Sequence, residues 1–130
     1  MTDKAGDQAY KNRYVVGFVE PVQIADENNL LHRFLARVDS GATRSSIDKK
    51  IVEKLNLGPV IGKGLIRNAN GQVRRDVIKV TLHIGDETYT EEFTVADRGH
   101  LNFPVLIGRN ILTKGFLIDP EKSPARGEEE

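Results

Sequence analysis

The stretch Val38-Asp39-Ser40-Gly41-Ala42 decides how this sequence is interpreted. It places an acid, a hydroxyl and a glycine directly after an apolar approach, an arrangement typical of a sharp turn at the end of a strand, with Gly41 supplying backbone freedom. Aspartate, serine and glycine are ordinary turn formers, so the turn alone does not separate a structural role from a chemical one. Its meaning depends on the segments around it.

Those segments are mostly short strands rich in β-branched and aromatic residues. Pro21 limits the first of them to a strand that ends there or lies at an edge. Turn residues separate the others: residues 26–29 predict a hairpin that leads into Asp39, and Asn70-Gly71 is a strong hairpin dipeptide. Residues 85–87 predict another turn. The predicted strands cover residues 14–19, 22–24, 31–38, 77–84, 88–96, 103–107 and 116–118.

Two helical segments interrupt the strands. Residues 48–58 predict a short helix that Asp48 caps and that Gly58, followed by Pro59, ends. A second, shorter segment covers residues 108–112. Many short strands with two brief helices predict a mainly β fold, a closed or partly closed barrel, because a parallel doubly wound sheet needs more helices.

The length of 130 residues predicts one domain. We expect a disordered N-terminal tail over residues 1–13, the barrel over 14–120 and a polar C-terminal tail over 121–130. Lys plus Arg and Asp plus Glu both number 19, so nothing predicts a nucleic-acid partner. The sequence has no cysteine, signal peptide or long apolar run, so we expect a cytoplasmic protein without a membrane partner.

The order of three features gives the acid turn its context. After Asp39-Ser40-Gly41 come the Asn70-Gly71 hairpin and then Leu106-Ile107-Gly108-Arg109-Asn110-Ile111-Leu112. In this order they resemble a retropepsin, the half-sized aspartic protease of retroviruses. The resemblance implies an acid-protease β-barrel, a flap at Asn70-Gly71 and Gly108 beneath the catalytic loop.

Four linked segments carry a closer resemblance over about residues 14–124: Arg37 to Ala42, Arg74 to Ile78, Ala96-Asp97-Arg98, and Phe103 to Arg109, followed by Phe116 to Pro120. They are similar to the family named ATP-dependent zinc proteases, which has a retropepsin-like fold. Its members often accompany an ATP-grasp ligase that adds glutamates to a ribosomal protein, which implies a peptidase acting on glutamate-rich tails. One departure is Thr43-Arg44-Ser45, where relatives often have Lys-Thr-Ser; it bears mainly on specificity.

The resemblance implies a homodimer. Aspartic-protease chemistry needs two carboxyl groups that share a proton, and this chain has one Asp-Ser/Thr-Gly triplet, since Asp97-Arg98-Gly99 has no hydroxyl in the middle. Each chain would then contribute one catalytic Asp. The implied catalytic positions are Asp39, Ser40 and Gly41, and the implied supporting positions are Ser45, Gly108, Arg109 and Asn110.

Several arginines lie near the segments that would surround a cleft, and guanidinium groups suit carboxylate binding. The substrate-binding candidates are Ala42, Arg67, Asn70, Arg74, Arg75 and Arg98. The competing interpretation is that the pair Arg74-Arg75 is simply solvated and that Arg109 makes a structural or interface salt bridge.

Zinc has little support in the sequence itself. No His-Glu-x-x-His motif occurs, and His32, His83 and His100 have no close ligand spacing. We therefore expect no metal and no cofactor. Two alternatives remain beside the aspartic peptidase: a non-catalytic peptide-binding module on the same barrel, and the ATP-dependent zinc protease of the family name.

Overall fold

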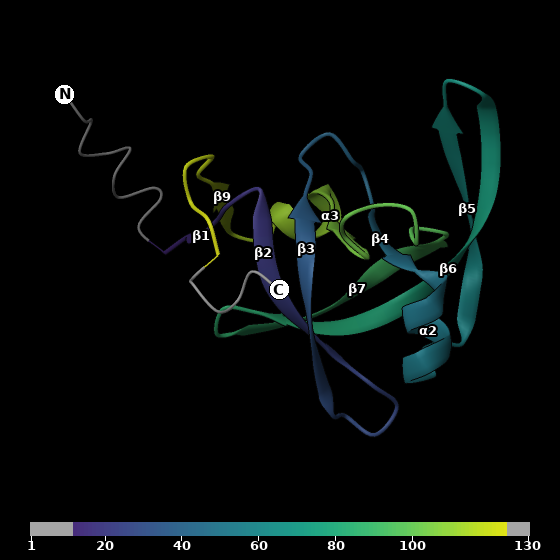
Figure 1. Ribbon diagram of the computed structural model, residues 1–130, viewed down its shortest axis with the longest axis horizontal. Helices are drawn as coiled ribbons and strands as arrows, with labels where there is room; N and C mark the ends of the chain where they lie inside the picture. The colour runs from purple at the N-terminus through teal and green to yellow at the C-terminus, as the bar shows by residue number, and fades with distance from the viewer. Residues whose placement is uncertain (1–11, 125–130) are drawn as a thin grey trace.

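The computed structural model describes residues 12–124, apart from the side chain of Asn68. The described chain is a β-barrel with two short helices (Figure 1). The strands are β1 (Tyr14–Val16), β2 (Val19–Ala25), β3 (Leu31–Val38), β4 (Ser45–Asp48), β5 (Val60–Asn68), β6 (Gly71–Ile84), β7 (Glu87–Ala96), β8 (Val105–Ile107) and β9 (Phe116–Ile118), and the helices are α2 (Lys49–Leu55) and α3 (Arg109–Leu112).

Six strands close the barrel. The main sheet has the order β2-β3-β8-β4-β7-β6-β5, and β2 also pairs with β6 through Gln23 opposite His83 and Ile24 opposite Leu82. This extra pairing closes the six strands from β2 to β6 into a barrel and leaves β5 outside, attached only to β6. The prediction of a mainly β closed barrel with one or two short helices is confirmed.

The core follows the two-residue period of the strands. On β6, Ile78, Val80, Leu82 and Ile84 are all buried, and the residues between them are more exposed. Side chains from the other strands except β5, and from both helices, fill the rest of the interior around Phe93. Burial of these apolar groups stabilises the barrel that holds the acid turn.

The first predicted strand is two strands. It breaks after Val16 because the Gly17 N–H donates to the carboxylate of Glu20, at 2.8 Å, rather than to a neighbouring strand. Pro21 does not end β2; it lies opposite Leu35 of β3. The position tolerates proline because β2 pairs with β6 only further along, so no second strand needs the missing N–H.

Both ends of α2 differ from the prediction. Asp48 is the N-cap residue but its side chain makes no capping hydrogen bond; its Oδ1 accepts the backbone N–H of Arg98 at 3.0 Å instead. Asn56, rather than Gly58, takes the left-handed conformation (φ 52°) that ends the helix. Asp48 thus ties the loop after β7 to the helix.

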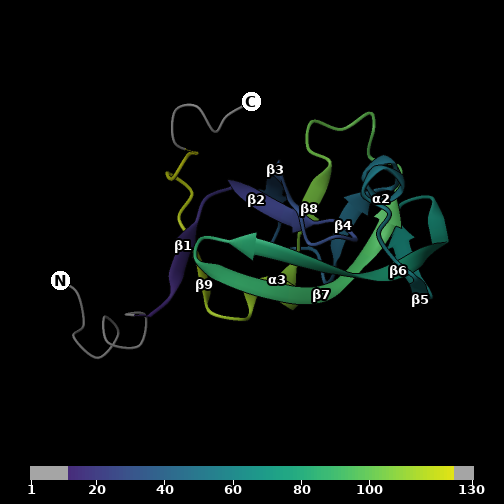
Figure 2. The same ribbon diagram turned by 90° about the horizontal axis from the view of Figure 1, so that it is seen from below.

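The hairpin of β5 and β6 projects beyond the barrel (Figures 1 and 2). The β3–β4 loop lies on the same side of the barrel as its tip (Figure 1). Asn68 pairs with Gly71, so the turn residues are Ala69 and Asn70, one position earlier than predicted, and Gly71 has the positive φ of 119°. We call this element, residues 60–78, the β5–β6 hairpin.

The ends of the described chain lie together. β1 and β9 form a separate parallel pair, and Lys122 reaches back to Glu20, whose side chain is 3% exposed, at 3.0 Å. Lys122 lies within the predicted polar C-terminal tail, and residues 1–11 and 125–130 of the two predicted tails lie outside the described residues. Residues 12–124 contain no helix with the length and apolar character to cross a membrane.

Candidate functional site

The acid turn, residues 39–41, follows β3 directly. Its backbone continues the pairing with β8, because the Asp39 N–H donates to the Ile107 carbonyl at 2.9 Å. The Gly41 N–H donates to Asp39 Oδ1 at 2.9 Å and the Ala42 N–H donates to the Asp39 carbonyl at 3.2 Å. The carboxylate is therefore held on a tight turn, half-buried, at the rim of the barrel.

The reason for glycine at position 41 differs from the expectation. Gly41 has no left-handed backbone. A Cβ there would lie 3.1 Å from Asp39 Oδ1, so a side chain would crowd the carboxylate that its own N–H binds.

Gly108 lies directly against the loop that follows the acid turn. A Cβ at Gly108 would come within 2.5 Å of the Arg44 carbonyl oxygen and 2.9 Å of the Ala42 carbonyl oxygen. This close approach lets the Arg109 N–H donate to Ala42 at 2.8 Å and the Asn110 N–H donate to Thr43 at 3.2 Å. The start of α3 thus fixes the backbone of the loop.

Asn110 and Ser45 connect the same loop to the barrel. Asn110 Oδ1 accepts both the backbone N–H of Ser45, at 3.1 Å, and its hydroxyl, at 2.8 Å, while Asn110 Nδ2 donates to the Glu92 carbonyl at 2.8 Å. The Ser45 hydroxyl in turn accepts the Gly108 N–H at 3.0 Å. These contacts satisfy polar groups that are largely buried.

Arg109 binds the loop from its exposed side. Its guanidinium donates to the Ser40 carbonyl at 2.9 Å and to the Thr43 hydroxyl at 3.0 Å. A salt bridge was one expectation for Arg109, but among residues 12–124 it makes these hydrogen bonds and no ion pair.

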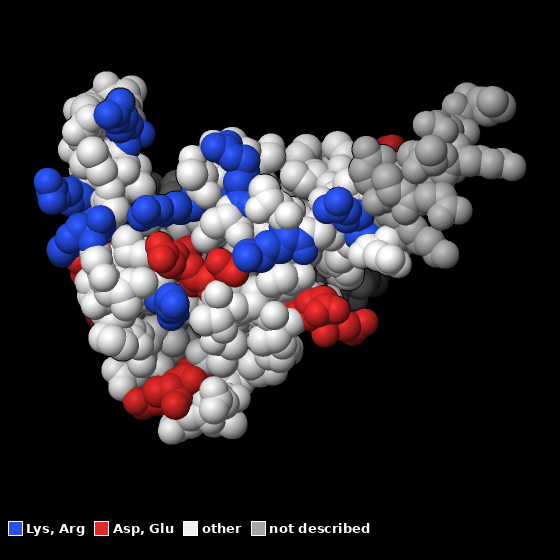
Figure 3. Space-filling model, turned by 180° about the vertical axis from the view of Figure 1, so that it is seen from behind, with Lys and Arg blue, Asp and Glu red and all other residues white. Residues whose placement is uncertain are grey.

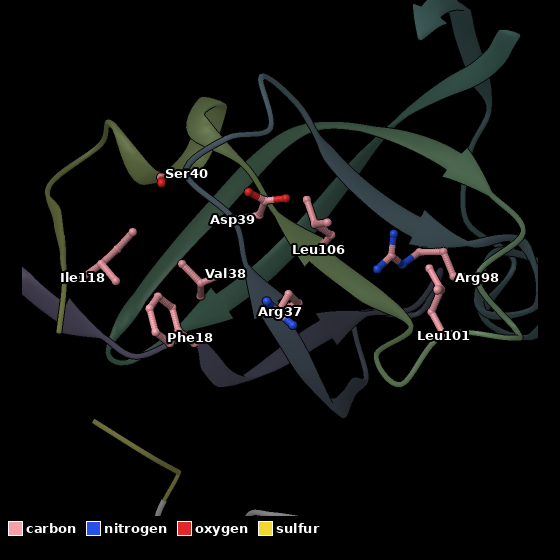
Figure 4. Close-up of a pocket in the computed structure, with 9 residues that line it drawn as sticks. All are labelled: Phe18, Arg37, Val38, Asp39, Ser40, Arg98, Leu101, Leu106 and Ile118. Atoms are coloured by element: carbon pink, nitrogen blue, oxygen red, sulfur yellow. The ribbon is translucent and has the colours of Figure 1, made fainter. Parts of the chain in front are cut away.

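Two hollows meet at the acid turn, and Asp39, Arg98 and Leu106 line both. The first, of about 430 Å³, also contains Phe18 and Ile118, and Figure 4 shows Asp39 between these residues and Arg98. The second, of about 630 Å³, extends from the acid turn to the β5–β6 hairpin, and we call it the groove. Its other lining residues are Gly41, Ala42, Thr43, Arg44, Ser46, Leu65, Ile66, Arg67, Arg75 and Thr94.

The predicted substrate-binding residues divide at the groove. Ala42, Arg67, Arg75 and Arg98 line it, whereas Arg74 and Asn70 do not. Arg74 and Arg75 are neighbours on β6, so their side chains leave the strand on opposite faces and only one of them reaches the groove. Lys and Arg side chains lie on both sides of the notch between the hairpin and the barrel (Figure 3).

Arg98 is the most confined of these cations. Its Nε donates to the Phe103 carbonyl at 3.1 Å, which fixes the side chain beside the β7–β8 loop. Burial lowers the pKa of Arg98, and the positive charge of Arg75 lowers it further, against the opposing effect of Asp48 and Asp39. Two guanidinium groups are therefore close enough to repel each other beside Asp39.

Sequence reasoning missed part of the groove, namely Arg44, Ser46, Thr94 and Leu106. Ser46 and Asp48 leave β4 on one face and Ser45 and Ile47 on the other, as the strand period requires. Residues 45–48 were not predicted to be a strand. The alternation of side chains along a strand was therefore not applied to them, and the sequence did not show that Ser45 and Ser46 point in opposite directions.

Two of the three histidines have ordinary partners. His32 Nε2 lies 2.9 Å from Asp26 Oδ2 across the β2–β3 hairpin, and His83 lies beside the Thr88 hydroxyl. In the described part of the chain, no three His, Asp or Glu side chains come together in an arrangement that suits a metal ion.

Comparisons with known proteins place this geometry in a family. The model of the RimB-like family, described as the retropepsin-like aspartic endopeptidase RimB, matches residues 53–129, more than half of the chain but not the acid turn itself. Solved structures with the same fold include EIAV protease in complex with an inhibitor, with a TM-score of 0.58 and 20% identity over 87% of this chain and 92% of that one. Simian foamy virus protease has a TM-score of 0.54 and 18% identity over 73% of this chain and 91% of its own. A Legionella pneumophila protein of unknown function has a TM-score of 0.60 and 18% identity over 85% of this chain and 96% of its own.

The curated relatives are longer proteins. A probable alpha-L-glutamate ligase of Desulfotalea psychrophila is 30% identical over 119 residues, and that of Parasynechococcus marenigrum is 29% identical over 119 residues; each match covers 72% of this chain. The chain spans about a quarter of the length of these relatives. The resemblance stated from the sequence is confirmed, and the chain belongs to the RimB-like family of retropepsin-like aspartic endopeptidases.

Proposed function

We propose that the chain is an aspartic peptidase that works as a homodimer with one catalytic Asp39 from each copy. The observation that carries this proposal is the position of the Asp39 carboxylate, held by the Gly41 N–H on a supported loop at the meeting point of two hollows. A single carboxylate in that position is half of the group that aspartic proteases use.

The chemistry is addition of water across a peptide bond. Two carboxyl groups about 3 Å apart hold one proton between them. The unprotonated one takes a proton from a water as its oxygen bonds to the carbonyl carbon, and the protonated one donates to the carbonyl oxygen. The C–N bond then breaks as the leaving nitrogen gains a proton. Ser40 and Gly41 complete the turn that presents the carboxylate.

A second copy would complete the first hollow. Phe18 and Leu101 line it beside Asp39, yet they are 50% and 46% exposed. Large apolar side chains at that exposure beside a half-site favour contact with a twofold-related copy, which would bring the second Asp39 to the first. Sedimentation equilibrium should give a dimer, and Phe18→Asp should shift it toward monomer.

Glutamate-rich peptides are the substrate class that fits best. The curated relatives are named glutamate ligases, and the guanidinium groups of Arg67, Arg75 and Arg98 line the groove. Arginine binds carboxylates through paired N–H groups, so a peptide with acidic side chains would be held along the groove.

The test is hydrolysis of a blocked oligo-glutamate peptide by the purified chain. Asp39→Asn should lower the rate about a thousandfold, since general acid–base groups contribute about 10² to 10⁴. The matched control is Asp97→Asn, in an exposed turn of the same length, which should stay within about twofold of the parent. Equal rates for the parent chain and Asp39→Asn would contradict the aspartic mechanism.

The same assay separates the alternatives. A non-catalytic binding module would bind the peptide without any hydrolysis in the parent chain. A zinc protease would lose activity with a chelator and regain it with zinc, and would not depend on a dimer of Asp39 groups.

A further inference from the structure

A hydroxyl group without a partner lies in the groove. Ser46 is 7% exposed, and its Oγ is the one buried side-chain oxygen or nitrogen among residues 12–124 that has no hydrogen-bond partner. An unsatisfied buried hydroxyl costs stability, so its presence at the wall of an open groove points to a ligand.

The surroundings of Ser46 define what that ligand is. Its backbone lies between Thr94 of β7 and Leu106 of β8, which line the groove with it. The Thr94 hydroxyl already donates to the Ser45 carbonyl, at 3.4 Å. Ser46 Oγ therefore has no partner, but the oxygen itself is covered, so a rotation about its χ1 would be needed to bring its proton to an oxygen in the groove.

The charges around this hydroxyl call for an anion. Four arginines line the groove against a single acid, Asp39. None of the four arginines forms an ion pair within residues 12–124. Arg75 also repels Arg98, and a bound negative charge would relieve that repulsion.

Arg44 closes the site on the hairpin side. A Cβ at Gly64 would lie 2.6 Å from Arg44 Nη1, so the guanidinium rests on the bare backbone of β5. The groove therefore has cations on three walls: Arg44 from the β3–β4 loop, Arg75 from β6 and Arg98 from the β7–β8 loop.

We propose that Ser46, with Arg75 and Arg98, forms a subsite that binds the carboxylate of one substrate side chain next to the cleaved bond. The Ser46 hydroxyl and the two guanidinium groups donate to the carboxylate oxygens. This proposal rests on the proposed function and adds a location: the acidic side chain that decides specificity is the one that reaches the floor of the groove at β4. The twofold dimer would contain this subsite on both sides of the bond.

Binding to Asp39→Asn protein tests the subsite without cleavage. Calorimetric titration with a blocked hexaglutamate peptide should show binding, and the matching hexaglutamine peptide should bind at least tenfold more weakly. Ser46→Ala in the same background should weaken hexaglutamate binding about tenfold, because the lost hydrogen bond is to a charged group. Arg75→Gln should weaken it by at least as much.

Two controls keep the result specific. Lys79→Gln removes the same charge from a separate hollow on β6, and should change binding by less than twofold. Ser46→Ala should not lower the melting temperature, because the hydroxyl it removes has no partner in the free protein.

The outcomes are distinguishable. If Ser46→Ala binds hexaglutamate as tightly as its parent, or if Lys79→Gln weakens binding as much as Arg75→Gln, the subsite is wrong even if the parent chain cleaves peptides. If binding follows the expected pattern and the chain with Asp39 intact cleaves nothing, the subsite holds and the peptidase proposal fails.

Discussion

Residues 12–124 contain two Asp-x-Gly turns with the same local hydrogen bond and very different surroundings. In the acid turn Gly41 N–H donates to Asp39 Oδ1 at 2.9 Å, and in residues 97–99 Gly99 N–H donates to Asp97 Oδ1 at 3.2 Å. The Asp97 side chain is 64% exposed, with Lys49 3.9 Å away. Asp39 instead is half-buried between two hollows, and β8 and α3 hold its loop.

The comparison shows that the Asp-x-Gly sequence makes the turn, while distant segments make the site. A local hydrogen bond forms wherever such a turn occurs. What distinguishes residues 39–41 is the backbone of Gly108 and the side chain of Asn110, more than sixty residues later. Substitutions at Gly108 and Asn110 should therefore disturb the acid turn, and matched substitutions around residues 97–99 should not.

The largest effect on stability is expected at Gly108. Gly108→Ala places a methyl group 2.5 Å from the Arg44 carbonyl oxygen, so the loop or α3 must move. We expect the free energy of unfolding to fall by about 3 kcal/mol, measured by urea denaturation, together with loss of peptide hydrolysis.

The control is the glycine of the other turn. A Cβ at Gly99 would meet Asp97 Oδ1 at 3.5 Å and Lys50 Nζ at 3.7 Å, which is ordinary contact. Gly99→Ala should therefore be neutral or stabilise the protein by up to about 1 kcal/mol. Equal losses in the two variants would show that position 108 has no special role.

The next effect is expected at Asn110. Asn110→Ala leaves the backbone N–H of Ser45, a buried residue, without its acceptor and frees the Glu92 carbonyl. The free energy of unfolding should fall by about 2 kcal/mol. Asn102→Ala, at an exposed position of the β7–β8 loop, should change it by less than about 0.5 kcal/mol. A similar small change in Asn110→Ala would contradict the supporting role.

The sequence was enough for much of this architecture. Alternating apolar residues, as on β6, predicted the strands, and the order of the acid turn, hairpin and Gly108 segment pointed to the barrel. These are features of local spacing and of chain order, which a sequence displays directly.

The membership of the groove could not be predicted, because it depends on which side chains point to the same face of a strand. Arg74 and Arg75 look equivalent in the sequence, yet only Arg75 lines the groove, and Ser46 was not recognised beside Ser45. The expected capping hydrogen bond of Asp48 is absent, and its carboxylate instead accepts the Arg98 N–H from the β7–β8 loop. Such choices are made by tertiary contacts, so a single sequence does not reveal them.

A third aspartate turn, at residues 26–30, is expected to show the smallest effect on stability. It serves as a comparison in which the aspartate has a structural role alone. Asp26 Oδ1 accepts the N–H groups of Asn28, at 2.8 Å, and Leu30, at 3.0 Å, and Oδ2 lies 2.9 Å from His32 Nε2. The hydrogen bond with His32 and those two N–H groups hold the pKa of Asp26 below its ordinary value of 3.8, against burial, which raises it. None of the residues of this turn lines the groove.

The sign of the pH effect follows from that lowered pKa. A carboxyl whose folded pKa is depressed adds stability above its unfolded pKa and loses it as the pH falls through the folded value. The difference in unfolding free energy between the parent chain and Asp26→Asn should therefore be constant above about pH 5 and shrink below pH 3.8. Thermal unfolding from pH 6 to pH 2.5 measures it. His32→Phe removes the leading cause of the lowered pKa and should reduce the pH dependence. A difference in unfolding free energy that does not change with pH would show that the charge of Asp26 does not stabilise this turn.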